Sequence, residues 1–272
     1  MSVSYERKEK YGISDLLEIM QILRSDEGCP WDRVQTHKSI RKDMIEEAYE
    51  VCEAIDLEDG ALLKEELGDV LLQVIHHARI EEEKGNFDFG DVCDGICKKL
   101  ILRHPHVFSD TQVSSTGEVL DNWDKIKQES KGQTTFTETL ESVPKTFPAM
   151  MRAQKVRKRA AKSGFDYPDI YWAMGDLESE VDELQNALEE EDPRQCFDEL
   201  GDVMFCAVNM ARFLKIDAEE CLNESTKKFI RRFAKLEKLA VEQGVDMNEC
   251  SMPQLEALWK QAKSTVTPSE EN

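Results

Sequence analysis

Two groups of four acidic residues stand at matching spacing in this 272-residue sequence. Each group consists of two pairs, and the members of a pair are three residues apart. The first group is Glu47, Glu50, Glu66 and Asp69, and the second is Glu180, Glu183, Glu199 and Asp202. Residues three apart in an α-helix share a face, so the two pairs of a group can converge if successive helices pack antiparallel.

These acids lack the basic neighbours that usually accompany glutamates on a helix surface. Solvated helix acids are commonly balanced by Lys or Arg three or four residues away, and none of the eight has such a neighbour. Clustered carboxylates without a basic partner repel one another unless protons, basic residues from elsewhere or metal ions compensate. A solvated acidic surface is the ordinary alternative, but this pattern favours a bound divalent cation.

The donor atoms indicate which cation. Sites built only from oxygen suit hard ions, and we expect Mg²⁺, with Mn²⁺ as a possible substitute. A di-iron bundle normally supplies Glu-x-x-His motifs, which the sequence lacks. Zinc has little support, because His104 and His106 offer at most two nitrogens and are better explained by loop packing. No P-loop or EF-hand motif is present.

Apolar residues recur at helical spacing almost throughout, and no strand pattern is evident, which predicts an all-α fold. Ser14, Thr36 and Ser115 are candidate N-caps, the last as a capping box with Glu118, and Pro253 stands near the start of the last predicted helix. Loops are expected at residues 28–32, around 85–86, at 104–108 and at 163–168.

The sequence contains an internal repeat. Each acid of the first group reappears 133 residues later in the second, and the segments Lys98–Arg103 and Lys227–Arg232 correspond after a small change of register. A shift preserved across two helices predicts a duplicated helical module. We expect a first module over residues 11–127, a polar linker over 128–140 and a second module over 141–264.

Composition narrows the class of protein. The net charge of −21 disfavours nucleic acid as a partner, because the chain would repel a phosphate backbone. No apolar signal core and no run of eighteen apolar residues is present, so we expect a cytoplasmic protein with no membrane contact. The eight cysteines are scattered, as expected of reduced packing residues.

The motifs in their order resemble those of the MazG nucleoside triphosphate pyrophosphohydrolases. Glu-Glu-x-x-Glu precedes Glu-x-x-Asp, with Gly-Cys-Pro-Trp-Asp before them and Arg-His-Pro-His-Val-Phe after them, and the resemblance extends from about Ile13 to Lys263. It implies Mg²⁺-dependent hydrolysis of NTP or dNTP to monophosphate and pyrophosphate. It also implies broad base tolerance, nucleotide-pool cleansing, two tandem MazG-like helical-bundle modules, and a homodimer.

The resemblance also assigns roles to particular residues. It implies that the eight acids hold the metal, that Lys228 and Arg232 face the phosphates, and that Trp259 lies against the nucleotide. The first-half counterparts of those three are Lys99, Arg103 and Trp123. One carboxylate would orient or deprotonate the attacking water, with Glu46 or Glu47 and Glu180 as candidates. A different class of function, a non-catalytic nucleotide sensor or interaction scaffold, would use the acids only to bind metal.

The second half departs from the family pattern in two places. Ser179 stands where the first half has Glu46, and Asp176 stands where a family lysine often lies. In tandem members of the family the second module is frequently the active one, so we expect the second half to carry most of the catalysis.

Overall fold

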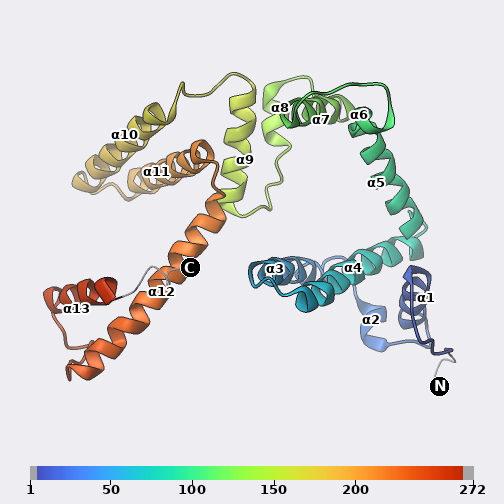
Figure 1. Ribbon diagram of the computed structural model, residues 1–272, viewed down its shortest axis with the longest axis horizontal. Helices are drawn as coiled ribbons and strands as arrows, with labels where there is room; N and C mark the ends of the chain where they lie inside the picture. The colour runs from blue at the N-terminus through green and yellow to red at the C-terminus, as the bar shows by residue number, and fades with distance from the viewer. Residues whose placement is uncertain (1–4, 266–272) are drawn as a thin grey trace. The chain divides into compact units, whose positions relative to one another are not determined.

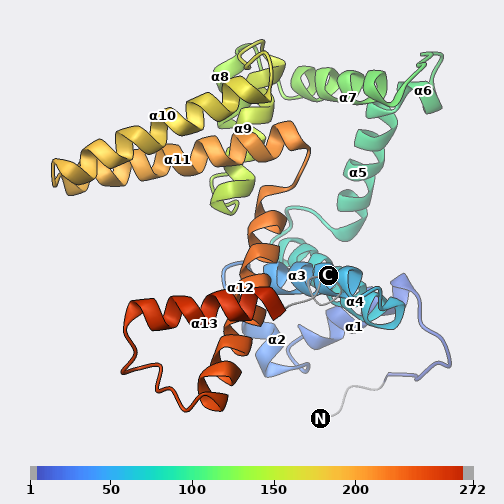
Figure 2. The same ribbon diagram turned by 60° about the vertical axis from the view of Figure 1, so that its left-hand side comes forward.

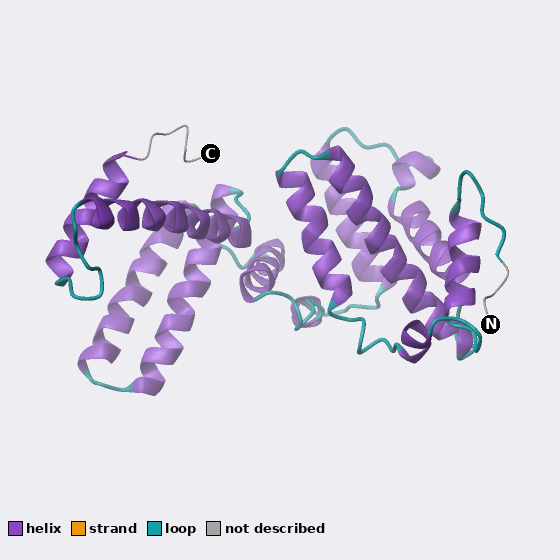
Figure 3. Cartoon of the chain, turned by 90° about the horizontal axis from the view of Figure 1, so that it is seen from below, coloured by secondary structure: helices purple, strands orange, loops and turns teal. Residues whose placement is uncertain are grey.

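A computed structural model describes residues 5–265 of the protein, and every regular element in that range is an α-helix, as Figure 3 shows. The predicted all-α fold is confirmed. The chain divides after Lys127 into two compact units, and each is described by itself. No helix in the described range is long and apolar enough to cross a membrane.

The first unit is organised around its longest helix, α4. The order of helices along the chain is α1 (Ile13–Leu23), α2 (Pro30–Val34), α3 (Asp43–Asp56), α4 (Gly60–Glu83), α5 (Phe89–Arg103), α6 (Pro105–Phe108) and α7 (Thr116–Ser130), which runs past Lys127. Helices α1, α3 and α5 each contact α4. Its core includes Met20, Ile40 and Ile75, each 1% exposed.

A buried arginine ties the start of this unit to α4. Arg24, at the end of α1, donates through Nε and Nη2 to the two carboxylate oxygens of Glu83, at 2.9 and 2.8 Å. Its Nη1 donates to the backbone oxygens of Asp32 and Gln35, at 2.6 and 3.2 Å. A guanidinium can donate several hydrogen bonds at once in a fixed planar geometry. Arg24 therefore holds α1, α2 and α4 together.

The second unit contains a second long hairpin and a separate helix pair. Its helices are α8 (Phe136–Glu141), α9 (Ala149–Lys162), α10 (Ile170–Glu189), α11 (Pro193–Leu214), α12 (Ala218–Glu242) and α13 (Met252–Thr265). Helices α10 and α11 lie side by side, with α9 packed on α11 (Figure 1). Helix α13 packs on α12 around Leu236, Ala240, Leu258 and Ala262.

The helical hairpins α3–α4 and α10–α11 close through the same three-residue turn. Helix α3 ends in Leu57, then Glu58 adopts a left-handed φ of 52°, and Asp59 caps α4 by accepting from the amides of Ala61 and Leu62. The amide of Asp59 returns to the carbonyl of Ala54 at 3.1 Å, which satisfies an acceptor that the end of the helix exposes.

The second hairpin repeats this turn 133 residues later. Glu191 is left-handed with φ 54°, and Asp192 caps α11 by accepting from the amides of Arg194 and Gln195. The amide of Asp192 bonds to the carbonyl of Ala187 at 3.3 Å. Both Ala54 and Ala187 are completely buried, so a small side chain stands where each hairpin closes. The duplicated sequence therefore gives a duplicated helix register.

Several local predictions need correction. Ser14 lies inside α1, whose N-cap is Gly12, because the Asp15 carboxylate already binds the Gly12 amide. Thr36 and Ser39 bond to each other in a turn before α3, and α3 instead starts after Lys42. Ser115 does cap α7, since its hydroxyl accepts from the Glu118 amide at 3.2 Å.

The segments predicted as loops also differ. Residues Pro30–Val34 and Pro105–Phe108 form the short helices α2 and α6, each with proline in its first turn, where the missing amide costs nothing. The predicted loops around 85–86 and at 163–168 contain glycines with positive φ, Gly85 and Gly164. In the polar segment 128–140, residues 131–135 lie outside helices.

The capped turn makes a prediction about stability. Asp192→Ala removes the acceptor from the first turn of α11, so we expect the free energy of unfolding to fall by about 1 kcal/mol. Asp192→Asn keeps an oxygen acceptor and should retain most of the stability. Urea denaturation followed by circular dichroism measures both. An alanine variant as stable as the parent would contradict the capping role.

Candidate functional site

The first hairpin gathers acidic residues in the way that their spacing predicts. Glu47 and Glu50 stand on α3, and Glu66 and Asp69 stand on α4. Carboxylate oxygens of Glu47, Glu66 and Asp69 all lie within 4.8 Å of one another. The charge of Glu50 contributes to the raised pKa of both Glu47 and Glu66, so it stands beside the same cluster.

The second hairpin gathers the corresponding residues. Glu180 and Glu183 stand on α10, and Glu199 and Asp202 stand on α11. Carboxylate oxygens of Glu180, Glu199 and Asp202 again lie within 4.8 Å of one another. Ser179 donates its hydroxyl to Glu183 at 3.4 Å, so the serine that replaces the leading glutamate of the first half contacts the acidic group.

In both clusters, burial and repulsion between neighbouring carboxylates destabilise the ionised form. Desolvation raises the pKa of Glu47, and the negative charges of Asp69 and Glu50 raise it further. Desolvation also raises the pKa of Glu180, followed by the charges of Glu183 and Asp202. Such crowded carboxylates favour either a shared proton or a cation between them. The converging donors are all oxygen, which fits a hard divalent ion such as Mg²⁺.

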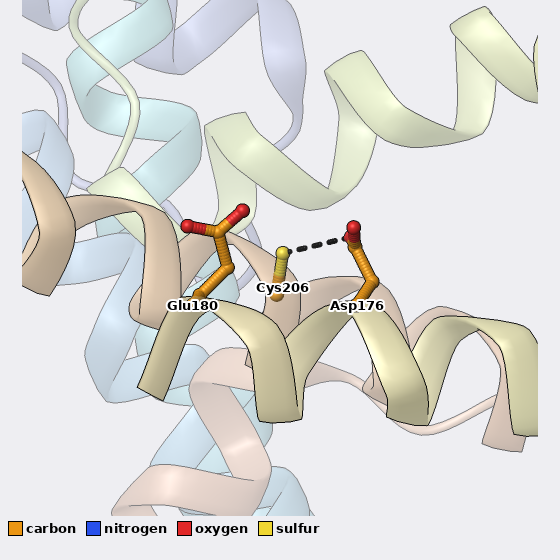
Figure 4. A group of neighbouring side chains, drawn as sticks. All are labelled: Asp176, Glu180 and Cys206. Carbon is orange, nitrogen blue, oxygen red and sulfur yellow. Dashed lines mark hydrogen bonds between the residues drawn. The ribbon is translucent and has the colours of Figure 1, made fainter. Parts of the chain in front are cut away.

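The second site has two further groups, drawn in Figure 4. Asp176 stands one turn before Glu180 on α10, and Cys206 stands one turn after Asp202 on α11. The Cys206 thiol donates to Asp176 Oδ2 at 3.1 Å. Burial, and then the hydrogen bond to Asp176, raise the pKa of Cys206 to about 12, so this thiol stays protonated. Ligand atoms of Asp176, Glu180 and Cys206 lie within 4.8 Å of one another.

Sequence reasoning did not single out Cys206 as a site residue, although its spacing gave a signal. Cys206 follows Asp202 by four residues and therefore shares its helix face. Its first-half counterpart, 133 residues earlier, is Gln73. Gln73 is 7% exposed, and its side-chain oxygen is buried without a hydrogen-bond partner. The two sites thus share their acids and differ in the residue one turn further along the second helix.

The residues expected to contact nucleotide stand on other helices. Lys228 and Arg232 are on α12, and Trp259 is on α13. The Trp259 ring packs against Phe229, with ring centroids 5.3 Å apart. The indole therefore contacts α12, the helix that carries both basic residues. Helix α12 leads away from the α10–α11 hairpin (Figure 2).

The first-half counterparts are arranged differently. Lys99 and Arg103 stand on α5, and Trp123 stands on α7. The Arg103 guanidinium lies over the Trp123 ring, 5.3 Å from its centroid, and His104 meets the same ring edge-on at 4.9 Å. Here the indole face is occupied by a cation, whereas Trp259 in the second half packs on a phenyl ring.

Comparison with known proteins accords with this geometry. The MazG nucleotide pyrophosphohydrolase domain matches the chain twice, over residues 35–108 and 173–236. Those ranges include α3–α4 and most of α10–α11, the two hairpins that carry the acids.

Several relatives align over most of the chain. A nucleoside triphosphate pyrophosphohydrolase of Escherichia coli K12 is 41% identical over 254 residues, covering 92% of this chain and 97% of the relative. A nucleoside triphosphate pyrophosphohydrolase/pyrophosphatase MazG of Thermotoga maritima is 42% identical over 249 residues, covering 92% and 94%. The uncharacterized protein YabN of Bacillus subtilis is 43% identical over 264 residues, covering 97% of this chain and 54% of its own length. With the domain present twice and two relatives aligned almost end to end, the chain belongs to the MazG family.

Proposed function

We propose that this protein hydrolyses nucleoside triphosphates, NTP or dNTP, to nucleoside monophosphates and pyrophosphate. The observation that carries the proposal is the convergence of three carboxylates in each hairpin of a chain that belongs to the MazG family. The names of the Escherichia coli and Thermotoga maritima relatives support the same reaction. Broad base tolerance and a role in clearing the nucleotide pool belong to the proposal.

Mg²⁺ is the cofactor that we propose, with Mn²⁺ as a substitute. Glu180, Glu183, Glu199 and Asp202 would hold it in the second unit, and Glu47, Glu50, Glu66 and Asp69 would do so in the first. The bound cation would neutralise phosphate charge and lower the pKa of a coordinated water. The helices hold these carboxylates together, and no Lys or Arg stands three or four residues from any of them.

The candidate for the base that orients or deprotonates water is Glu180 in the second unit. Its carboxylate lies within the acidic group that would hold the cation, so a water bound to that cation would stand within reach of its oxygens. Glu47 has the corresponding place in the first unit. Glu46, the other first-half candidate, pairs with Lys42 at an exposed position on α3.

A homodimer would complete the site. Apolar side chains spaced four apart on α5, namely Val92, Ile96 and Leu100, remain exposed in the single chain, as do Phe229 and Ile230 on α12. Contiguous exposed apolar faces mark association surfaces. We propose that a second copy covers such faces and that Lys228, Arg232 and Trp259 meet the triphosphate in that assembly. A cytoplasmic location accords with eight free cysteines.

The reaction itself is tested by its products. We expect the purified protein to release monophosphate and pyrophosphate from a panel of nucleoside triphosphates, only with Mg²⁺ or Mn²⁺ present. Chromatography of the nucleotide products, with separate assays of pyrophosphate and orthophosphate, decides between this reaction and others. Release of nucleoside diphosphate with orthophosphate, or undiminished turnover in excess chelator, would contradict the proposed reaction. Metal binding without any turnover would favour the sensor or scaffold alternative.

The metal site is tested by stability. Because the carboxylates repel one another without a cation, we expect Mg²⁺ to raise the melting temperature. The double variant Glu180→Gln with Glu199→Gln should blunt that rise, leaving the contribution of the first unit. Glu178→Gln with Glu190→Gln removes the same charge from exposed positions outside the cluster and serves as the control. A full Mg²⁺ response in the Glu180/Glu199 variant would show that the site lies elsewhere.

The division of labour between the units is tested by single variants. Lys228, Arg231 and Arg232 give α12 more positive charge than α5 carries near Leu102, and positive charge facing a triphosphate stabilises the departing pyrophosphate. We therefore expect Glu183→Gln to lower turnover by roughly a hundredfold or more, and Glu50→Gln to lower it much less. Steady-state rates, with helical content checked by circular dichroism, measure the difference. The reverse order would make the first unit the enzyme.

A further inference from the structure

The second unit contains a basic pocket away from the acidic cluster. It lies between α9, the end of α11 and the start of α12, and has a volume of about 570 Å³. Its charged lining consists of Lys155, Lys158, Arg212 and Lys215 against a single acid, Asp217. In a chain of net charge −21, a concave surface with four cations and one anion is unusual.

Most of that positive charge is not neutralised within the protein. Lys158 and Lys215 form no ion pair with any residue that the structure describes, and Lys155 lies over the Phe147 ring at 5.4 Å. Arg212 does pair with Asp166, and it also donates to Asn209. The Asp217 carboxylate is engaged as the N-cap of α12, where it accepts from the Glu220 amide at 3.1 Å.

The pocket is held in shape by hydrogen bonds between its walls. Gln154 on α9 donates to the Ile216 carbonyl at 2.6 Å and accepts from the Ala218 amide at 3.2 Å. The Met151 amide donates to Glu219 at 3.3 Å. These bonds fix α9 against the start of α12, so the lysines border a preformed space. Preformed sites lose less free energy to ordering when a ligand binds.

The first unit has the same pocket with the opposite charge. It lies between α1, α4 and the start of α5, with a volume of about 330 Å³. Gln21 and Arg79 correspond there to Gln154 and Arg212 at the 133-residue offset, and Asp88 caps α5 as Asp217 caps α12. The sign changes because Glu82 occupies the place of Lys215, and Glu18 also lines the pocket.

We propose that the pocket of the second unit is a binding site for a phosphate-bearing anion, either an inorganic polyphosphate or the phosphate chain of a nucleotide. Lysine ammonium groups bind phosphate oxygens as point charges, and the volume is within the range of small-ligand sites. The site is distinct from the carboxylate cluster. Arg212 follows Asp202 by ten residues on α11, roughly 15 Å along the helix axis.

Binding of inorganic tripolyphosphate to the full chain tests the proposal, measured by isothermal titration calorimetry in excess chelator. Without metal, the acidic clusters repel the probe, and variants of the pocket lysines separate binding there from binding at Lys228 and Arg232. We expect Lys158→Glu with Lys215→Glu to weaken binding at least about tenfold. Lys125→Glu with Lys238→Glu makes the same charge change at exposed lysines outside the pocket, and should leave the affinity within about twofold.

Each outcome of the titrations either supports or overturns the proposed anion site. No saturable binding by the parent, an unchanged affinity in the pocket variant, or an equal loss in the control would overturn the proposal. If circular dichroism shows that the variant Lys158→Glu with Lys215→Glu does not fold, Lys158→Gln with Lys215→Gln replaces it. This second variant should still weaken binding severalfold. A nucleoside triphosphate titrated alongside tripolyphosphate distinguishes the sources, because tighter binding of the nucleotide shows that more than the phosphate chain is recognised. Catalysis is not the readout, so failure here leaves the proposed hydrolysis untouched.

Discussion

The structure depends on the short turn that closes each helical hairpin. A left-handed glutamate followed by a capping aspartate reverses the chain within three residues, which leaves no freedom in the pairing of the two helices. A slip of one residue would rotate each acid by about 100° around its helix, away from the acids of the other helix. The completely buried Ala54 and Ala187 let the helices meet closely at the closed end. The register of the carboxylates is therefore set by residues that carry no functional group for the site.

That register has an electrostatic cost, which the pKa shifts show. Glu47, Glu66 and Glu180 all have raised pKa values, in each case through desolvation first and neighbouring carboxylates next. The caps and the buried residues of the hairpins, such as Ala54 and Ala187, hold the helices in this register with the like charges side by side. A folded protein that keeps such a cluster is prepared to bind a cation, since the repulsion is already present before the cation arrives.

Sequence patterns predicted the features that depend on helix periodicity and the repeat. The all-α fold follows from the apolar periodicity, and the convergence of Glu47 with Glu66 and Asp69 follows from their three-residue spacing once the two helices pack antiparallel. Local predictions failed where two side chains competed for one role, as when Asp15 took the amide of Gly12 and left Ser14 inside the helix. Residues 30–34 and 105–108 fall in segments predicted as loops but form short helices, because proline in the first turn can start a helix. Cys206 was missed because a cysteine on an apolar face usually only packs.

The two halves share some residues of the module and differ in others. The turn, the four acids, and a glutamine and an arginine that line the neighbouring pocket recur at one offset. The charge of the pocket lining does not recur: Glu82 in one half stands where Lys215 stands in the other. Gln73 and Cys206 diverge in the same way beside the acids. A change in the turn would alter every contact of the hairpin, whereas a change from Glu82 to a lysine alters the charge of one pocket. The duplication thus preserved one scaffold and left its two pockets free to acquire opposite charge.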